Sequence, residues 1–278
     1  MASAFQEFEK YINEKVGSVN TRLAYLRDIS HMFEWLKTQE VYDAADVNGA
    51  LLMQYIELME KDGRTSATIS RNIASMKKFF GFTKSKGYTF ADPAANIKSP
   101  KVIRKSPEIL SEKDIKKLLA APDVSTAKGV RDKAILELMA STGINTSEII
   151  ALKVGDVNFR TQTVKVEADG RVIEFGRKTM DHLKAYSKVR KQFLEAGRAG
   201  DRTYFLSCAG EKLTRQGFWK IVRTCGKMAG IDEISPKTLR HSFAVAALRH
   251  GKDAAFIQQM LGHSSKAGVQ EYKSLAEK

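Results

Sequence analysis

Two stretches near the end of the chain decide the predicted fold: Ser235-Pro-Lys-Thr-Leu-Arg-His-Ser-Phe-Ala244 and Leu261-Gly-His-Ser-Ser265. The first is predicted to begin a helix that carries Arg240 and His241 in its first turns. The second is predicted to end another helix and to present His263 from a loop, with Tyr272 nine positions further on. Each residue alone is a weak signal, because a tyrosine near a chain end usually packs in a core and a histidine at a helix end is often a cap.

The chain around these stretches, from residue 108 onward, is predicted to be mostly helical with one small antiparallel sheet. Gly143 interrupts a long helix, and a short helix begins at Ser147. The segment Thr163–Phe175 changes from helical to alternating periodicity around Asp169-Gly170, which is a typical two-residue hairpin signal. Helical periodicity is also predicted for residues 128–141, 178–196, 215–229, 236–250 and 254–261.

The net charge of +14 is unevenly distributed. Residues 1–97 carry 12 Lys/Arg and 12 Asp/Glu, whereas residues 98–278 carry 34 and 20. Solubility does not require this segregation, but a polyanionic partner favours it, since each neutralised phosphate releases counterions. A basic membrane-surface protein is the alternative, although the sequence offers no strongly cationic amphipathic helix with an aromatic anchor face. The distribution favours nucleic acid as the partner.

Residues 1–96 are predicted to form a helical domain of four helices. The fourth helix, opened by Ser66, carries Arg71, Lys77 and Lys78 outside its apolar stripe. We expect these three side chains to contact DNA, the alternative being an ordinary solvated helix face. The apolar stripes of the first, second and fourth helices are Phe5, Phe8, Tyr11 and Ile12; Leu23, Leu26, Ile29, Phe33 and Leu36; and Ile69, Ile73, Met76 and Phe80.

Residues 97–107 are predicted to form an extended linker to a second domain, residues 108–278. Pro100 and Pro107 exclude a continuous helix through this segment. Its charge is suited to a phosphate backbone, although a merely solvated tether fits the composition equally well. The basic residues of the linker are Lys98, Lys101, Arg104 and Lys105.

Composition also narrows the compartment and the chemistry. Cys208 and Cys225 are too few for a disulfide framework and lack the spacing of zinc ligands. No apolar run approaches the ~18–20 residues of a membrane span, and the first residues are acidic and polar, unlike a secretory signal. We therefore expect a cytoplasmic protein without membrane association, metal or small-molecule cofactor.

Taken together, the motifs resemble the tyrosine recombinases, most closely the Xer and phage-integrase branch. Thr238–Ala244 and Leu261–Ser265 match the two most specific boxes of that family. Residues 18–28 resemble the start of its helical, SAM-like core-binding domain, and residues 131–156 resemble the opening of its catalytic domain. The resemblance covers nearly the whole chain. It implies a mainly α protein, with a helical DNA-binding domain followed by a mixed α/β catalytic domain that contains a small antiparallel sheet.

The resemblance also implies a reaction and its residues. In this family a tyrosine attacks a backbone phosphate of duplex DNA, giving a 3′-phosphotyrosine and a free 5′-hydroxyl, and rejoining reverses the step. Tyr272 matches the nucleophile, Arg240 the second arginine, His263 the second histidine-type position and Lys237 the first. These matches predict site-specific strand cleavage and rejoining without a cofactor.

Three departures from the family pattern put that activity in question. Asn145 stands where the first arginine belongs, and a neutral amide cannot give the charge-assisted contact of a guanidinium. The hairpin lacks the usual general-acid lysine, for which Lys165 or Arg171 are possible substitutes. Only six residues follow Tyr272, fewer than the tail that docks onto a neighbouring subunit in Xer-like members, so homo-oligomeric assembly on DNA is also in question.

Two hypotheses follow. The first is a recombinase that clamps duplex DNA between its two domains and cleaves it slowly. The second is a DNA-binding architectural or regulatory factor of the same fold that has lost cleavage. Formation of a covalent protein–DNA adduct distinguishes them.

Overall fold

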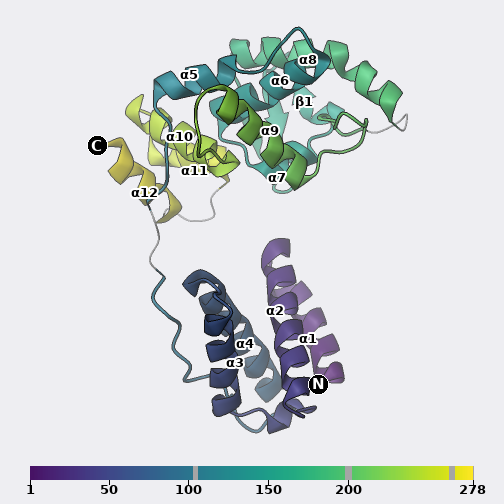
Figure 1. Cartoon of the computed structure of the whole chain (residues 1–278), viewed down its shortest axis with the longest axis vertical. Coiled ribbons are helices and arrows are strands. Elements are labelled where there is room, and N and C mark those ends of the chain that lie inside the picture. The colour runs from purple at the N-terminus through teal and green to yellow at the C-terminus, as the bar shows by residue number, and fades with distance from the viewer. Residues whose placement is uncertain (103–105, 198–201, 263–266, 278) are drawn as a thin grey trace. The chain divides into compact units, whose positions relative to one another are not determined.

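The computed structural model describes the chain except for residues 103–105, 198–201, 263–266 and 278. The chain forms two compact units, Met1–Lys105 and Ser106–Lys278 (Figure 1). Arg104, Lys105 and His263, for which the sequence predicts contacts with DNA or its phosphates, lie outside the described residues. Within the described ranges, no helix combines the length and apolarity needed to cross a bilayer.

The N-terminal unit is a bundle of four α-helices. They are α1 (Ala2–Lys15), α2 (Val19–Thr38), α3 (Gly49–Lys61) and α4 (Ser66–Ser85), with a 3-10 turn at Ala44–Asp46. Side chains cap three of the helices: Ser18, Asn48 and Thr65 each accept a hydrogen bond from the backbone N–H three residues later. Most of the predicted apolar stripe residues are buried in one core, although Leu23 is 61% exposed.

The segment that follows α4 remains attached to this bundle over part of its length. Ile97 is buried in the N-terminal core, and the hydroxyl of Ser70 donates a hydrogen bond to the carbonyl of Pro100 at 3.1 Å. Ile109 packs in the second unit, where the Leu110 N–H donates to Ser242 Oγ at 2.8 Å. The predicted linker is therefore anchored at its start by an apolar side chain that the proline-rich composition concealed.

The C-terminal unit is mostly helical, and it confirms the predicted mixed architecture. Its helices are α5 (Glu112–Ala120), α6 (Ala127–Thr142), α7 (Thr146–Ala151), α8 (Arg177–Ala196), α9 (Arg215–Met228), α10 (Pro236–Arg249), α11 (Ala254–Leu261) and α12 (Ala267–Ala276). A second 3-10 turn spans Val154–Asp156. Long helix α6 ends at Gly143, whose φ of 65° is the left-handed conformation that glycine adopts at low cost.

A three-stranded antiparallel sheet lies in the same unit, in the order β1 (Val157–Asn158), β2 (Thr163–Lys165) and β3 (Val172–Glu174). Lys165 pairs with Val172, and Val166 N–H donates to Arg171 O at 2.7 Å. The expected two-residue hairpin is therefore wrong: the loop spans residues 167–170. Gly170 N–H bonds Val166 O, and its φ of 71° closes this longer loop.

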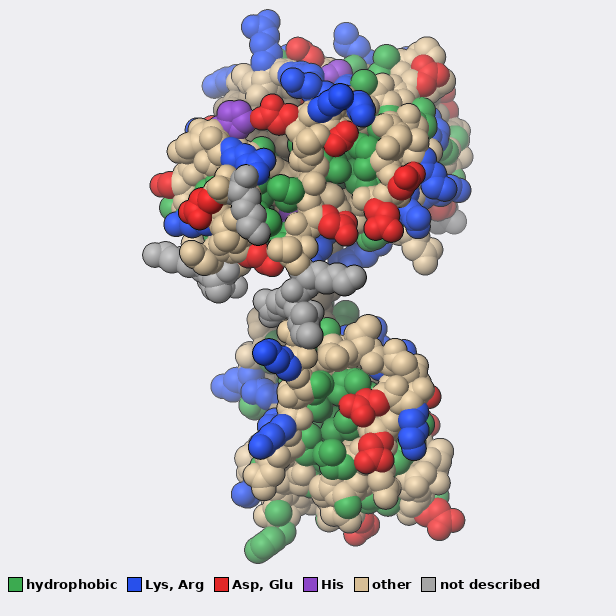
Figure 2. All heavy atoms as spheres, turned by 60° about the vertical axis from the view of Figure 1, so that its left-hand side comes forward, with side chains coloured by type: hydrophobic (Ala, Val, Ile, Leu, Met, Phe, Trp, Pro, Cys, Tyr) green, Lys and Arg blue, Asp and Glu red, His purple; other side chains and the backbone are tan. Residues whose placement is uncertain are grey.

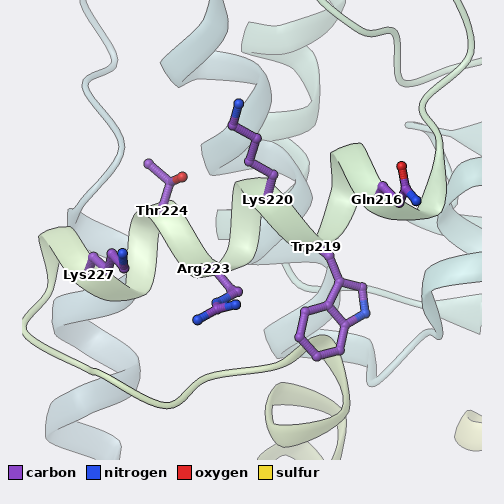
Figure 3. Close-up of a pocket in the computed structure, with 6 residues that line it drawn as sticks. All are labelled: Gln216, Trp219, Lys220, Arg223, Thr224 and Lys227. Carbon is purple, nitrogen blue, oxygen red and sulfur yellow. The ribbon is translucent and has the colours of Figure 1, made fainter.

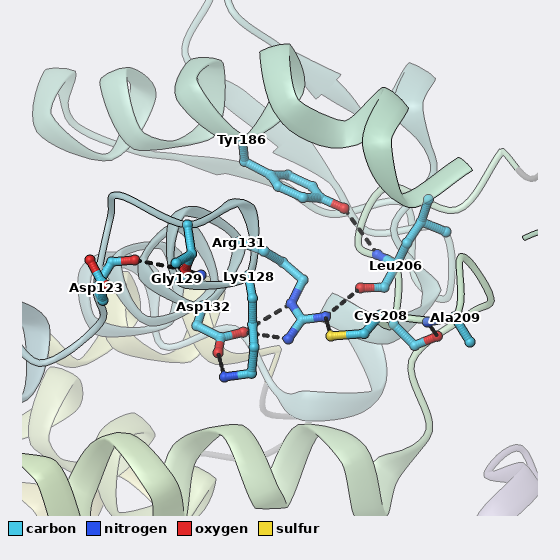
Figure 4. A network of polar contacts seen from close by, with 11 residues as sticks. Asp123, Lys128, Gly129, Arg131, Asp132, Tyr186, Leu206, Cys208 and Ala209 are labelled. Atoms are coloured by element: carbon cyan, nitrogen blue, oxygen red, sulfur yellow. Dashed lines mark hydrogen bonds and ion pairs between the residues drawn. The ribbon is translucent and has the colours of Figure 1, made fainter. Parts of the chain in front are cut away.

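Arg131 of helix α6 forms a buried ion pair with its neighbour Asp132 and a hydrogen bond to the segment around Leu206 (Figure 4). The guanidinium of Arg131 contacts Asp132 through Nε at 2.9 Å and Nη2 at 2.7 Å, and its Nη1 donates to the Leu206 carbonyl at 3.0 Å and contacts Cys208 Sγ at 3.5 Å. Burial lowers the pKa of Arg131, but the Asp132 carboxylate outweighs it and the net shift is upward. Arg131 is therefore a structural cation that is fully engaged inside the fold.

Candidate functional site

Arg240 is the centre of the candidate site. Helix α10 holds it, and its guanidinium donates to two backbone carbonyls: Nη1 to Gly143 at 2.8 Å and Nη2 to Leu261 at 2.6 Å. These carbonyls lie at the ends of α6 and α11, so the side chain ties three helices together. Burial lowers the pKa of Arg240, and the nearby Glu148 and Tyr272 oppose that shift. A guanidinium has five N–H groups, so two carbonyl bonds leave donors for an anion.

Tyr272 lies in α12, a helix that the sequence analysis did not predict. Its side chain is 5% exposed and packs with Ala244, Val245 and Ile257 from α10 and α11. Its ring centroid is 5.4 Å from that of His241. Burial raises the pKa of Tyr272, while the positive charge of Arg240 pulls it down. The fold thus brings the phenol and the guanidinium, which are 32 positions apart, into one electrostatic environment.

Asn145 is the N-cap residue of helix α7. Its Oδ1 accepts from the Glu148 N–H at 3.0 Å, and its own N–H donates to Glu148 Oε2 at 3.0 Å. This reciprocal capping box begins α7. The contact uses the short amide, so nothing at position 145 replaces the charge of an arginine.

Two predicted cations lie at exposed positions. Lys237 is exposed at the start of α10, and Lys165 is exposed on β2. Residues on one strand alternate between faces, and Lys165 follows the buried Val164. Arg171 has the opposite environment: its side chain is 8% exposed, and its Nη2 lies 2.6 Å from Glu148 Oε1. The hairpin cation nearest to the site is therefore Arg171.

The predicted basic residues of the N-terminal unit have different environments. Arg71 is bound to Asp28 by two hydrogen bonds of 2.8 Å, from Nε and Nη2, and its side chain is 37% exposed. Lys77 is exposed, and Lys78 Nζ lies 5.3 Å from the centroid of the Tyr11 ring. Because Arg71 already neutralises a buried carboxylate, Lys77 and Lys78 are the better candidates for an external anion.

The basic linker residues within the described ranges, Lys98 and Lys101, are both exposed. Figure 2 shows one face of each unit, and on the C-terminal unit Lys and Arg side chains are interspersed there with Asp and Glu. The excess positive charge of this unit therefore does not form one continuous basic surface on the face shown.

Helix α9 carries a basic surface that the sequence analysis missed. Its sequence contains no acidic residue, and one side of it lines an open hollow of about 510 Å³. Every residue of this surface, here called the α9 face, is exposed, and the Trp219 indole is 46% exposed (Figure 3). The α9 face comprises Gln216, Trp219, Lys220, Arg223, Thr224 and Lys227. The spacing of these residues, three and four apart, was visible in the sequence as a cationic stripe opposite Phe218, Ile221 and Val222.

Two protein-family models match the sequence of this chain. The model of the phage integrase family matches residues 108–278, and the model of the N-terminal SAM-like domain of phage integrases matches residues 5–87. The chain therefore belongs to the phage integrase family of tyrosine recombinases.

Curated relatives agree over almost the full length. The chain is 33% identical to the tyrosine recombinase XerD of Listeria innocua over 266 residues, covering 94% of this chain and 90% of the relative. It is 34% identical to the tyrosine recombinase XerC of Roseiflexus castenholzii over 268 residues, covering 95% and 85%.

Solved structures establish the same fold at lower identity. The XerH site-specific recombinase bound to a palindromic difH substrate has a TM-score of 0.71 at 18% identity, covering 97% of this chain and 80% of that one. A lambda integrase dimer bound to a core site has a TM-score of 0.69 at 16% identity, covering 98% and 95%.

Proposed function

We propose that this chain is a site-specific DNA recombinase that cleaves and rejoins duplex DNA through Tyr272. The observation that carries the proposal is that Tyr272 packs in one cluster with Leu261, whose carbonyl accepts a hydrogen bond of 2.6 Å from Arg240 Nη2. A nucleophile beside a buried cation is the arrangement that phosphoryl transfer needs, because negative charge builds on the non-bridging oxygens as the phosphate is attacked.

In the proposed step, the hydroxyl oxygen of Tyr272 forms a bond to phosphorus while the bond from phosphorus to the 5′ oxygen breaks. The phenol gives its proton to an acceptor, and the departing oxygen takes up a proton, which leaves a 3′-phosphotyrosine and a 5′-hydroxyl. Attack by another 5′-hydroxyl reverses the step and regenerates the enzyme. Arg240 stabilises the charge on the phosphate, a contribution worth on the order of 10²–10³ in rate. Lys237 and Lys165 are the candidates for further cationic contacts.

DNA binding in this proposal rests on exposed cations of both units. The α9 face offers three of them without a neighbouring acid on its helix. The exposed Lys77, Lys98 and Lys101, together with the half-buried Lys78, offer a second set in the N-terminal unit. We propose that the two sets hold duplex DNA as a clamp joined by residues 97–107. Phosphate contacts of this kind fix the position of a protein on DNA without reading its sequence.

A covalent adduct tests cleavage. The chain is incubated with a nicked duplex that carries a sequence selected from bound genomic fragments, so that the cleaved end diffuses away and the phosphotyrosine is trapped. We expect a slow-migrating protein–DNA band that disappears in Tyr272→Phe.

A DNA-binding factor without cleavage is the second candidate. The neutral Asn145, committed to capping α7, favours it. DNA binding without any adduct would support this second candidate and contradict the first.

A further inference from the structure

Arg171 lies on the core-facing side of the β2–β3 hairpin. Residues 171, 173 and 175 alternate with outward-facing ones along the strand, and Ile173 and Phe175 are buried. Val166, to which Arg171 is hydrogen-bonded across the hairpin, is 2% exposed. The sheet therefore directs a guanidinium into the interior, where an arginine is costly unless charged or polar groups receive it.

Three groups accept hydrogen bonds from it. Arg171 Nη2 donates to Glu148 Oε1 at 2.6 Å, and Nη1 donates to the Met260 carbonyl at 3.0 Å and to the Gln259 carbonyl at 3.5 Å. The backbone of Gly262 is so close that a Cβ added there would lie 2.2 Å from Arg171 Nη1. A Cβ at position 262, where φ is 66°, would therefore displace this guanidinium from its position.

The same contacts place Arg171 close to Arg240 and Asn145, two members of the predicted site. Arg171 and Arg240 bond successive carbonyls at the end of α11, Met260 and Leu261. Glu148 offers one carboxylate oxygen to Arg171 and the other to the N–H of Asn145. The Glu148 carboxylate therefore lies between the Arg171 guanidinium and the backbone of Asn145, which stands where the family has its first arginine.

The charges around Arg171 and Arg240 indicate that this cluster can bind an anion. Two guanidinium groups face the largely buried Glu148 carboxylate, and the half-exposed Asp169 carboxylate lies at the solvent side of Arg171. The positive charge of Arg171 also adds to the shifts that lower the pKa of Arg240. The partial negative charge at the end of α11 offsets this repulsion only in part. In addition, Arg171 Nε is buried and donates no hydrogen bond to the described residues, although Asp169 Oδ2 lies 3.3 Å away.

We propose that Arg171 is the second catalytic arginine of this chain and supplies, from the hairpin, the guanidinium that Asn145 cannot. Arg171 and Arg240 share one largely buried carboxylate, Glu148, while the Asp169 carboxylate is half-exposed and screened by solvent, so the cluster is suited to a phosphodiester. Glu148 orients Arg171 for this contact, as a carboxylate commonly orients a cation that binds substrate. The proposal rests on the proposed function, since the phosphodiester is that of the cleaved strand.

The test compares two substrates and four proteins. The rate of adduct formation is measured under single-turnover conditions for the wild type, Arg171→Ala, Arg171→Lys and the control Arg160→Ala. Arg160 is an exposed arginine in the neighbouring β1–β2 turn of the same sheet. Each protein receives the nicked duplex with either a normal phosphate or a neutral methylphosphonate at the cleaved position, and its melting temperature is recorded.

Removing a cation that touches the reacting phosphate should slow cleavage of the charged phosphate substrate much more than cleavage of the neutral methylphosphonate. We expect Arg171→Ala to lower the adduct rate on the phosphate by on the order of 10²–10³, and to lower it less than tenfold on the methylphosphonate. Arg171→Lys should be intermediate, because an ammonium keeps the charge but not the forked geometry. Arg160→Ala should match the wild type.

The alternatives have distinct outcomes. An equal loss on both substrates would assign Arg171 a purely structural role and overturn this proposal, while cleavage through Tyr272 would stand. An unchanged rate in Arg171→Ala would overturn it as well. If the folded wild type formed no adduct with either substrate, the proposed function itself would fail, and the assignment of Arg171 with it.

Discussion

Replacing the cations of the α9 face provides the sharpest prediction about DNA binding. Lys220, Arg223 and Lys227 are exposed, so changing all three to Ala removes three positive charges while the core beneath them stays intact. Each phosphate contact contributes about 0.9 to the slope of log affinity against log salt concentration. The triple variant should therefore have a slope smaller by about 2.7 and a weaker affinity at low salt.

The assay is a titration of labelled duplex DNA with protein at several salt concentrations, accompanied by thermal melting. A matched control separates position from net charge. Lys184, Lys188 and Lys191 are exposed on α8, and their triple replacement by Ala removes the same charge elsewhere on the C-terminal unit. We expect this control to keep most of the wild-type slope, because distant exposed charges are screened beyond about 10 Å in 0.1 M salt.

Equal slopes for the wild type and the α9 variant would refute the reasoning. Equal losses in the α9 and α8 variants would show that net charge acts, and not the position of the α9 face. A large fall in melting temperature of the α9 variant would mean that these side chains support the fold.

Three further predictions concern stability and the N-terminal unit. Gly143→Ala should destabilise the chain by about 1–3 kcal/mol, because a Cβ there would lie 2.4 Å from a side-chain atom of α10. The control Gly155→Ala should keep the wild-type stability, because a Cβ there meets nothing within 4 Å, and equal melting temperatures of the two variants would contradict the prediction. Burial raises the pKa of Tyr204 from 10.0 to about 12, so the stability that its protonated phenol gives the folded state is present below pH 10 and is lost as pH rises toward 12. In chemical denaturation, Tyr204→Phe should lose less stability between pH 8 and pH 11.5 than the wild type, and an equal loss would contradict the assignment. Replacing Lys77 and Lys78 with Ala should weaken DNA binding without lowering the melting temperature, and unchanged affinity would identify them as a solvated helix face.

Much of the fold could be predicted because local signals and tertiary packing agree. The stripe of Ile69, Ile73, Met76 and Phe80 is buried, and the predicted helix start at Ser66 agrees with the structure. The mixed architecture of the C-terminal unit is confirmed. Helix α12 was missed because its apolar residues are few, and its Val269 and Tyr272 are buried only by packing against α10 and α11.

The candidate site was less predictable, because it is built from contacts between distant segments. Motif spacing selected Arg240 and Tyr272, and the structure brings these two together. The sequence left both Lys165 and Arg171 open as substitutes for the hairpin lysine, because Lys165 precedes the turn and an arginine is a poor general acid. Strict alternation with Ile173 and Phe175 would have placed Arg171 on the inner face. Its partner Glu148 belongs to the capping box of α7, which read as a purely local feature.

Both sequence hypotheses, an active recombinase and a silent DNA-binding factor, depended on the charge around the cleaved phosphate. Asn145 alone favoured the silent form, because it removes one guanidinium. The buried Arg171, 2.6 Å from Glu148, restores a second guanidinium to the same cluster. Slow cleavage is therefore the expected behaviour, with the missing general-acid lysine as the remaining deficit.

Peptide mapping of the trapped adduct tests the central claim most directly. After nuclease digestion of the DNA and proteolysis, mass spectrometry should find a nucleotide remnant on the peptide that contains Tyr272, with the phosphate joined to its phenolic oxygen and the DNA 3′ end. The same analysis of Tyr272→Phe should find no modified peptide. A remnant on any other residue, or an adduct that persists in Tyr272→Phe, would contradict the assignment of the nucleophile.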